Sequence, residues 1–133
     1  MDTWIIHCDG TALPRRGQMS IGVHALAPDG VEHTVSRALG DGDNNEAEAY
    51  ALVAALELAR SQGARSVECR SDSDVVVAHV TDRKRTSAAH IAAPLDRAVE
   101  LLREFDEARV VLVPRHRNVL ADRLARAALG LAT

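Results

Sequence analysis

The sequence predicts a single α/β domain built on a mixed β-sheet with helices packed on its faces. Three strand-like segments come first with no helix between them, and helical and strand-like segments then alternate to the end of the chain. No internal repeat, low-complexity block or Pro/Gly/Ser-rich linker interrupts the 133 residues. Residues 1–133 are therefore expected to form one domain, which is long enough to bury its own core.

The first three predicted strands cover residues 3–8, 20–27 and 31–38. The second and third are joined by Pro28-Asp29-Gly30, which is a strong signal for a reverse turn between two apolar runs. Tight turns join antiparallel neighbours. An antiparallel arrangement of these three strands is therefore expected.

Helices and short strands follow. Leu52, Leu56 and Ala59 are spaced to form the buried face of a helix from Asn45 to Arg60, and Gly63 lies just beyond its end. The remaining predicted elements are buried strands at 66–71 and 109–114 and helices near 73–80, near 94–107 and over 118–129.

The composition excludes two classes of nucleic-acid-binding protein. Only 2% of the residues are aromatic, which is too few for a platform that stacks bases. The net charge of −3 argues against a protein that binds phosphates over a broad basic surface. A polyanionic substrate would therefore need local positive charge.

The two cysteines are expected to be reduced thiols in the core. Cys8 and Cys69 lie in predicted strands and have no metal-ligand spacing. The chain shows neither a secretory signal nor a run of about 18 uncharged apolar residues. These features predict a cytoplasmic protein with no membrane span, and the lack of a heptad pattern or apolar stripe favours a monomer.

Four acidic residues stand at the ends of predicted elements. Asp9 closes the first strand, Asp72 follows the strand at 66–71, and Glu48 and Asp122 lie near the starts of two helices. If those two strands are parallel neighbours, Asp9 and Asp72 share the edge where open α/β sheets place their sites. Each acid also has a local explanation: a turn at Asp9-Gly10, a capping box Asn45-x-x-Glu48, a helix cap at Asp72 and a helix-dipole contact at Asp122.

Clustered carboxylates are used chemically to bind divalent metals. Mg²⁺ prefers oxygen ligands, keeps several waters and is commonly shared between carboxylates and substrate phosphates. Two such ions can activate a water molecule and stabilise the leaving oxygen of a phosphoryl displacement. The four acids would then serve as metal ligands rather than as proton carriers.

Four short motifs follow one another along the chain, and together they are specific. They are Cys8-Asp9-Gly10-Thr11, Asn44-Asn45-Glu46-Ala47-Glu48, Ser71-Asp72-Ser73, and Val113-Pro114-Arg115 with the following Asn118-x-x-Ala121-Asp122-x-Leu124-Ala125. Over nearly the whole chain these segments resemble the motifs of ribonuclease H of the type 1 class. The second motif resembles the family's Asn-Asn-x-x-Glu, which assigns the metal-binding glutamate to Glu48 rather than Glu46.

The resemblance implies a fold and an activity. The fold would be a five-stranded mixed sheet, with three antiparallel strands and then two parallel ones, and helices on both faces. Asp9, Glu48, Asp72 and Asp122 would hold two Mg²⁺ ions, which Mn²⁺ can replace. The protein would cleave the RNA strand of an RNA/DNA hybrid and leave 3′-hydroxyl and 5′-phosphate ends.

The resemblance also implies the residues that contact the RNA strand. Gly10, Thr11, Asn44 and Asn45 would lie near the scissile phosphate, where 2′-hydroxyl groups distinguish RNA from DNA. The lack of a side chain at Gly10 lets the backbone come close. The alternative for Asn44 and Asn45 is a simple loop and helix cap.

Several segments depart from the family pattern. Arg15-Arg16-Gly17 replaces an Asn-Pro-Gly turn, so two guanidinium groups can substitute a phosphate contact for the lost asparagine. Asp74 adds a fifth acid beside the site, where it would either repel phosphate or help to bind a cation. The long basic insertion of some members is missing, and Arg83-Lys84-Arg85 is a reduced version of it. This pattern is typical of the compact branch of the family.

The segment before the last acid is also short. Pro114-Arg115-His116-Arg117-Asn118 replaces the longer histidine loop of other members. Arg115 and the arginines that follow are either part of a solvated face or contacts to phosphate. His116 is either an exposed loop residue or an aid to proton transfer and product release. The other histidines are interpreted as structural or surface residues: His7, His24, His33, His79 and His90.

Other functions remain open at this stage. The 3′–5′ exonucleases on a related sheet usually carry Asp-x-Glu on the first strand, whereas Thr11 stands at the third position here. Resolvases and integrases share the sheet but fit the Asn pair and Glu48 less well. The alternative from a different class is a non-catalytic module that binds a hybrid or a partner on the same fold, which the four intact acids oppose because clustered like charges repel without metal.

Overall fold

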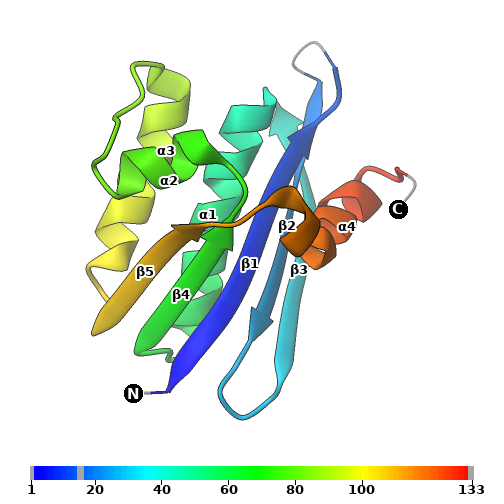
Figure 1. The fold of residues 1–133 in the computed structure, drawn as a ribbon. Coiled ribbons are helices and arrows are strands. Elements are labelled where there is room, and N and C mark those ends of the chain that lie inside the picture. Colours follow the sequence, from blue (N-terminus) through cyan, green and yellow to red (C-terminus); the bar gives the residue numbers. More distant parts are fainter. Residues whose placement is uncertain (1, 15–16, 132–133) are drawn as a thin grey trace.

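The computed structural model describes residues 2–14 and 17–131 and contains a five-stranded sheet (Figure 1). Its strands stand in the order β3-β2-β1-β4-β5. β1 pairs antiparallel with β2, β2 pairs antiparallel with β3, and β1, β4 and β5 are parallel. The predicted mixed sheet is confirmed. The strands are β1 (Thr3–Ala12), β2 (Gln18–Leu26), β3 (Glu32–Asp41), β4 (Ser66–Ser71) and β5 (Glu107–Leu112).

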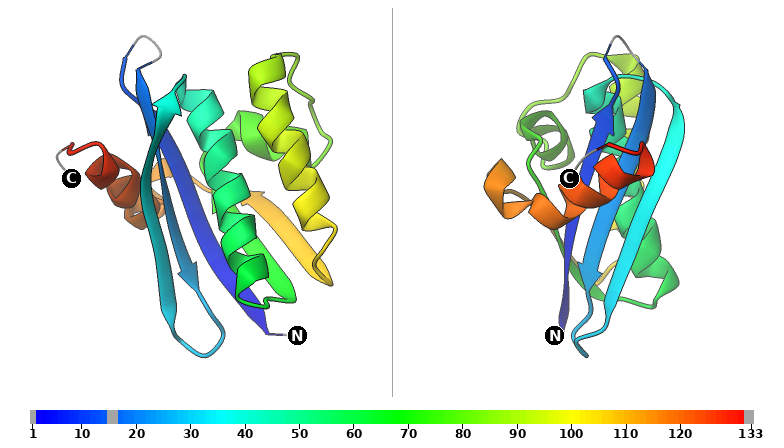
Figure 2. Two further views of the ribbon diagram at one scale, coloured as in Figure 1. Left: turned by 180° about the vertical axis from the view of Figure 1, so that it is seen from behind. Right: turned by 90° about the vertical axis from the view of Figure 1, so that its right-hand side faces the viewer.

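Helices cover both faces of the sheet, as the sequence predicts. α1 and α3 pack on one face, and α4 packs against β1, β2 and β3 on the other (Figure 2). The helices are α1 (Asn44–Ser61), α2 (Asp74–Val80), α3 (Ala89–Leu102) and α4 (Val119–Ala128), with a 3-10 turn η1 (Arg115–Arg117) before α4. None of the helices in the described ranges is long and apolar enough to cross a membrane.

The main core lies between the sheet and the layer formed by α1 and α3. Ile6, Val23 and Val67 from three adjacent strands meet Leu52 and Leu56 from α1, and all five are fully buried. Burial of a side chain of this size stabilises the fold by about 1.5–3 kcal/mol. The strands whose ends carry the site are therefore fixed in place by a well-packed hydrophobic core.

The first strand is longer than predicted. Asp9 was expected to close it, but the pairing with β2 continues from Asp9, opposite Gly22, to Ala12, opposite Met19. Asp9 and Gly10 are therefore strand residues, and the turn proposed for them is wrong. The strand extends because β2 pairs with it from Ile5 to Ala12, which the local sequence does not reveal.

The third helix and the last strand both begin earlier than predicted. The helix expected near 94–107 is α3, which begins at Ala89 because the buried apolar series Ile91, Leu95 and Ala98 starts before residue 94, and which ends at Leu102 rather than at 107. The strand expected at 109–114 begins at Glu107, which lies opposite Ser66 of β4. Register with the neighbouring strand sets this boundary.

Both cysteines are free and belong to the core, as expected. Burial raises the pKa of both thiols, that of Cys69 to about 12. The Cys8 thiol donates to the carbonyl oxygen of Arg70. Because the thiolate is the reactive form, neither residue is suited to catalysis.

Candidate active site

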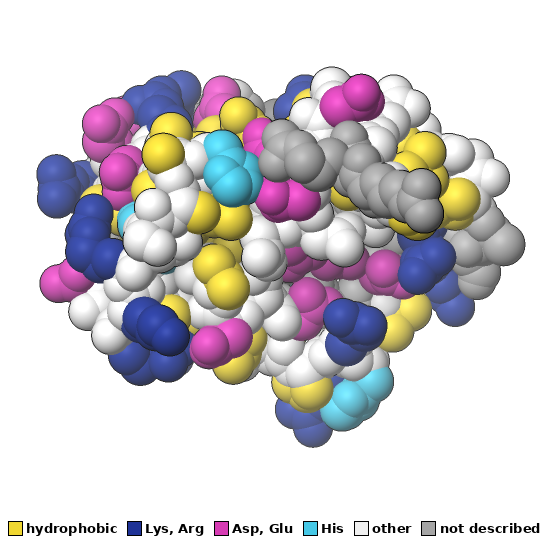
Figure 3. Space-filling model, turned by 90° about the horizontal axis from the view of Figure 1, so that it is seen from above, with side chains coloured by type: hydrophobic (Ala, Val, Ile, Leu, Met, Phe, Trp, Pro, Cys, Tyr) yellow, Lys and Arg dark blue, Asp and Glu magenta, His cyan; other side chains and the backbone are white. Residues whose placement is uncertain are grey.

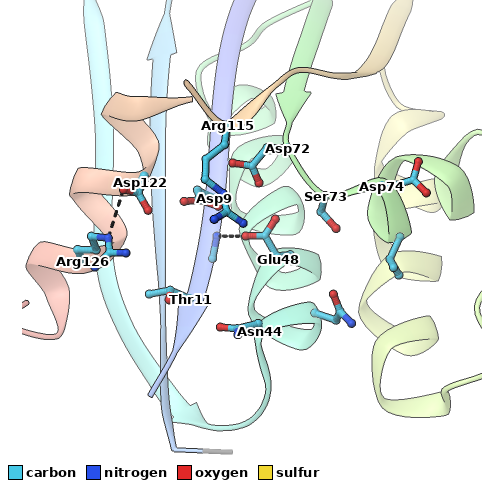
Figure 4. A pocket seen from close by; sticks show the side chains of 13 residues that line it. Asp9, Thr11, Asn44, Glu48, Asp72, Ser73, Asp74, Arg115, Asp122 and Arg126 are labelled. Carbon is cyan, nitrogen blue, oxygen red and sulfur yellow. Dashed lines mark hydrogen bonds and ion pairs between the residues drawn. The ribbon is translucent and has the colours of Figure 1, made fainter. Parts of the chain in front are cut away.

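Three carboxylates from different elements meet at the carboxyl ends of β1 and β4. One carboxylate oxygen from each of Asp9, Glu48 and Asp72 lies within 4.8 Å of the others. In Figure 4 the three side chains point toward one another from β1, α1 and the end of β4. They line a cavity of about 470 Å³. Figure 3 shows this hollow, with acidic side chains inside it and basic side chains on its rim.

Gly10 brings β1 into direct contact with α1. A Cβ atom at Gly10 would lie 2.2 Å from the carbonyl carbon of Ala47 and 2.5 Å from the backbone nitrogen of Glu48. The Gly10 N–H donates to Glu48 Oε1 over 2.8 Å. Glycine is therefore required here for packing against α1, a reason that differs from the approach of RNA to the backbone expected from the sequence.

The helix caps are made by other residues, so the acids are not used for capping. Asp43 caps α1, where its Oδ1 accepts from the Glu46 N–H over 2.8 Å and the Glu46 side chain completes a capping box. Ser73 caps α2. The capping roles considered for Glu48 with Asn45, and for Asp72, are therefore wrong.

The fourth acid stands at the side of this group. Asp122 lines the same cavity from the first turn of α4. Its carboxylate accepts a hydrogen bond from the Arg126 Nε–H over 3.3 Å (Figure 4). The structure thus brings three of the four predicted acids into one cluster and places the fourth beside them with a cationic partner.

The cluster strongly favours protonation in the absence of metal. Burial raises the pKa of the Asp9 carboxyl to about 7, hydrogen bonding with Glu48 acts in the opposite direction, and the charge of Asp72 adds to the increase. Burial raises the pKa of Glu48 well above its ordinary value, and hydrogen bonding with Asp9 raises it further. Both carboxyl groups therefore bind a proton more readily than an isolated acid does.

The donor set fits a divalent cation. Within the described residues, no lysine or arginine forms an ion pair with Asp9, Glu48 or Asp72, whereas other acids such as Asp106, Asp74 and Asp122 each have an arginine partner. Carboxylate oxygens are the ligands that Mg²⁺ and Mn²⁺ prefer. Buried carboxylates without counter-charge are stabilised when a metal replaces the proton.

Comparison with known proteins identifies the family. The profile of the family described as "Reverse transcriptase-like" matches residues 7–128. The chain is 35% identical to ribonuclease HI of Halobacterium salinarum over 122 residues, which are 91% of this chain. It superposes on the crystal structure of RNase H1 from the same organism with a TM-score of 0.89 and 34% identity, covering 96% of this chain and 98% of that one. The chain belongs to the ribonuclease H family.

A second solved structure comes from a complex. LC11-RNase H1 bound to an RNA/DNA hybrid is 28% identical to this chain and superposes with a TM-score of 0.87, covering 96% of each chain. The chain spans 61% of the length of the curated Halobacterium protein and 26% of the length of three mycobacterial relatives.

The residues expected to contact RNA all line the cavity that holds the acids: Gly10, Thr11, Asn44 and Asn45. Asn44 Oδ1 accepts from the backbone N–H of Ala12 over 2.8 Å. This bond orients the amide, so its N–H₂ group is the part left to donate. Asn45 is the second residue of α1 and not its cap, so the capping explanation for it is wrong.

The four residues expected to assist the site do not all lie in the cavity that holds the acids. Asp74 lines the cavity but accepts from Arg83 over 2.9 Å, so its charge is paired. Arg115 lines the cavity too, and in Figure 4 its side chain points into the cavity from the segment before α4. His116 lines a separate cavity, so the structure does not place it with the acids. Arg15 lies outside the described residues.

The basic segment after α2 is neutralised by acids. Arg83 pairs with Asp74, and Arg85 pairs with Asp82 and Asp96. Because these arginines are already paired with acids at the surface, they leave little net positive charge to attract phosphate. The segment is a weaker substitute for a basic insertion than the sequence suggests.

Two histidines have specific roles in the ribonuclease H fold. His79 is buried, its Nε2 lies 2.9 Å from Asp96, and its Nδ1 accepts from the Thr86 N–H, so it holds the segment between α2 and α3. His90 lies 2.7 Å from Asp43. Asp43, Glu46 and His90 form a second group of possible metal ligands, in which His90 is exposed and the two acids are half-buried; sequence spacing did not reveal this group.

Sequence reasoning missed one residue of the site. Asn118 is buried, and its Nδ2 donates to the carbonyl oxygen of Cys8 over 2.9 Å and to Asp72 Oδ2 over 3.4 Å. Its position before a helix predicts a cap and so hides this role. The only signal was its place in the closing motif.

Proposed function

We propose that this protein is an endoribonuclease that hydrolyses the RNA strand of RNA/DNA hybrids and leaves 3′-hydroxyl and 5′-phosphate ends. The observation that carries the proposal is the cluster of Asp9, Glu48 and Asp72, of which the first two are buried and the third is half-buried, with no ion pair to a lysine or arginine in the described part of the chain. The family relationship and the relative that binds an RNA/DNA hybrid support the choice of substrate.

Divalent ions are the cofactor that this cluster fits. Asp9, Glu48 and Asp72 would hold two Mg²⁺ ions with Asp122, and Mn²⁺ can replace Mg²⁺ because it prefers the same oxygen ligands. Ions bound there would activate a water molecule for attack on phosphorus and stabilise the leaving oxygen. To serve as a ligand, Asp122 must share or give up its bond to Arg126.

The remaining cavity residues supply substrate contacts. Among the described residues, Arg115 and Arg126 are the cations that line the cavity, and they provide local positive charge that a protein of net charge −3 requires. The Asn44 amide, held through its oxygen by Ala12, presents N–H donors to a 2′-hydroxyl, which can accept them. These contacts favour an RNA strand over DNA in the cavity.

A cleavage assay tests the proposal. A hybrid labelled on its RNA strand is expected to be cut with Mg²⁺ or Mn²⁺ and to remain intact in EDTA, while duplex DNA of the same sequence remains intact throughout. The products are expected to carry a 3′-hydroxyl, shown by extension with a polymerase. Rapid cleavage in excess chelator would overturn the mechanism. Binding of the hybrid without cleavage would instead identify a non-catalytic module.

A second prediction concerns recognition of the RNA strand by Asn45. Asn45→Ala is expected to lower kcat/KM for the hybrid roughly 5- to 150-fold, which corresponds to about 1–3 kcal/mol of lost hydrogen bonding. Since Asp43 is the helix cap, the unfolding midpoint is expected to change little. Asp43→Ala is the control that loses capping and stability. A loss of activity in Asn45→Ala that only follows unfolding would reject the recognition role.

A further inference from the structure

Asn118 occupies a helix-capping position but does not cap the helix. It precedes α4, where an asparagine oxygen ordinarily accepts from a backbone N–H of the first turn, yet its side chain makes no such bond. The residue is 1% exposed. Its Oδ1 atom is buried and has no hydrogen-bond partner in the described part of the chain. The side chain is therefore not placed to serve its own helix.

The amide nitrogen of Asn118 instead faces the acid cluster. Nδ2 donates to the Cys8 carbonyl and to Asp72 Oδ2. Both partners can only accept, so the orientation of the amide is fixed by chemistry. A buried oxygen without a hydrogen bond destabilises the folded state. In this orientation Oδ1 is left without a partner, whereas Nδ2 satisfies two acceptors at the site.

The amide acts at the point where the β1–β4 ladder ends. The last pair in this ladder is His7 opposite Arg70. Beyond it the two strands deliver Asp9 and Asp72 to the cluster. Asn118 bridges the Cys8 carbonyl, next to Asp9, and the carboxylate of Asp72. It therefore links β1 to the end of β4 where the backbone pairing of the two strands stops. The link comes from the connection between β5 and α4, which passes in front of β1 in Figure 1.

We propose that Asn118 is a positioning residue that sets the spacing of Asp9 and Asp72 for metal binding. The proposal rests on the proposed function in that these acids hold the ion. Residues that orient metal ligands typically change metal affinity or activity about 10- to 100-fold when they are replaced. Asn118 would act by the same means, since its amide fixes the backbone beside one ligand and the carboxylate of another.

Two substitutions separate this role from a structural one. Asn118→Ala removes both donors. Asn118→Ser keeps a residue that is favoured as a helix cap, but its short side chain cannot bridge both acceptors. Ser20→Ala is the matched control: Ser20 is fully buried and its hydroxyl donates to the Ala125 carbonyl of α4, so it also ties α4 to the sheet but touches no acid of the cluster.

The measurements are the unfolding midpoint in EDTA, Mn²⁺ binding by calorimetry, and kcat and KM for a hybrid. Both Asn118→Ala and Ser20→Ala are expected to melt below the parent, and Asn118→Ser above Asn118→Ala. Mn²⁺ affinity and kcat are expected to fall about 10- to 100-fold in both Asn118 variants, with little change of KM, and to stay at the parent value in Ser20→Ala.

Parent-like Mn²⁺ affinity in the two Asn118 variants would overturn the proposal, as would an equal loss in Ser20→Ala. A parent that binds Mn²⁺ but cuts no hybrid would count against the proposed function alone, because the comparison of affinities would still decide the role of Asn118. A parent that binds no Mn²⁺ would overturn both.

Discussion

Asp72→Asn is expected to lower kcat for hybrid cleavage by at least about a thousandfold, since a metal site supplies several kcal/mol of transition-state stabilisation. The amide keeps the size of the side chain but presents one neutral oxygen in place of a charged carboxylate. Asp72 lies at the end of β4 and does not cap α2, so the fold should remain intact. The measurement is single-turnover cleavage together with circular dichroism.

Asp74→Asn provides the matched control for this prediction. It is the same chemical change two residues away, at a side chain that lines the same cavity but is exposed and paired with Arg83. Its activity is expected to stay within about threefold of the parent, because exposed ion pairs contribute little. Near-full turnover by Asp72→Asn would remove Asp72 from the site, and an equal loss in both variants would show a general effect of charge.

The sequence predicts the location of the acids better than their environment. Asp9 and Asp72 follow apolar runs that read as neighbouring strands, so their meeting at one sheet edge follows from the order of the elements. The bond between Asp122 and Arg126 is also local, at a spacing of four residues on a helix. Only the structure shows that Asp122, which is bonded to Arg126, lies outside the group of three acids whose carboxylate oxygens come within 4.8 Å of one another.

Competition among neighbouring polar residues limits what can be predicted about caps. Asp43, Asn44 and Asn45 are all acceptable caps for α1, and Ser73 and Asp72 both suit α2. The helix begins where the backbone leaves β3 and packs on β1, which is fixed by the contact of Gly10 with α1. Long-range packing thus decides which residue caps and which acid remains available.

Residues that act across the fold are the least visible from the sequence. The two acceptors of Asn118 lie 110 and 46 residues away, and no local pattern marks such a contact. His116 illustrates the reverse error. It adjoins Arg115 in the chain, but the turn η1 places the two residues in different cavities.

Asp9→Asn is expected to be inactive and yet more stable than the parent in EDTA at neutral pH. The pKa of Asp9 is raised to about 7 from 3.8 in the unfolded chain, first by burial and then by the charge of Asp72. Between these values the native state binds more protons than the unfolded state, so parent stability falls as pH rises from about 4 to about 7. Above that window the cost is about 2–4 kcal/mol, and asparagine avoids it.

Thermal unfolding measured from pH 4 to pH 8 checks the predicted fall in parent stability with rising pH. The Asp9→Asn midpoint is expected to exceed that of the parent by roughly 5–10 °C at pH 8, with the smallest difference near pH 4, whereas Asp74→Asn should follow the parent throughout. Mg²⁺ binds the native state and should raise the parent midpoint more than that of Asp9→Asn. If Asp9→Asn is destabilised in EDTA and responds to Mg²⁺ as strongly as the parent does, Asp9 only stabilises the local strand structure, and the acids do not form a metal site.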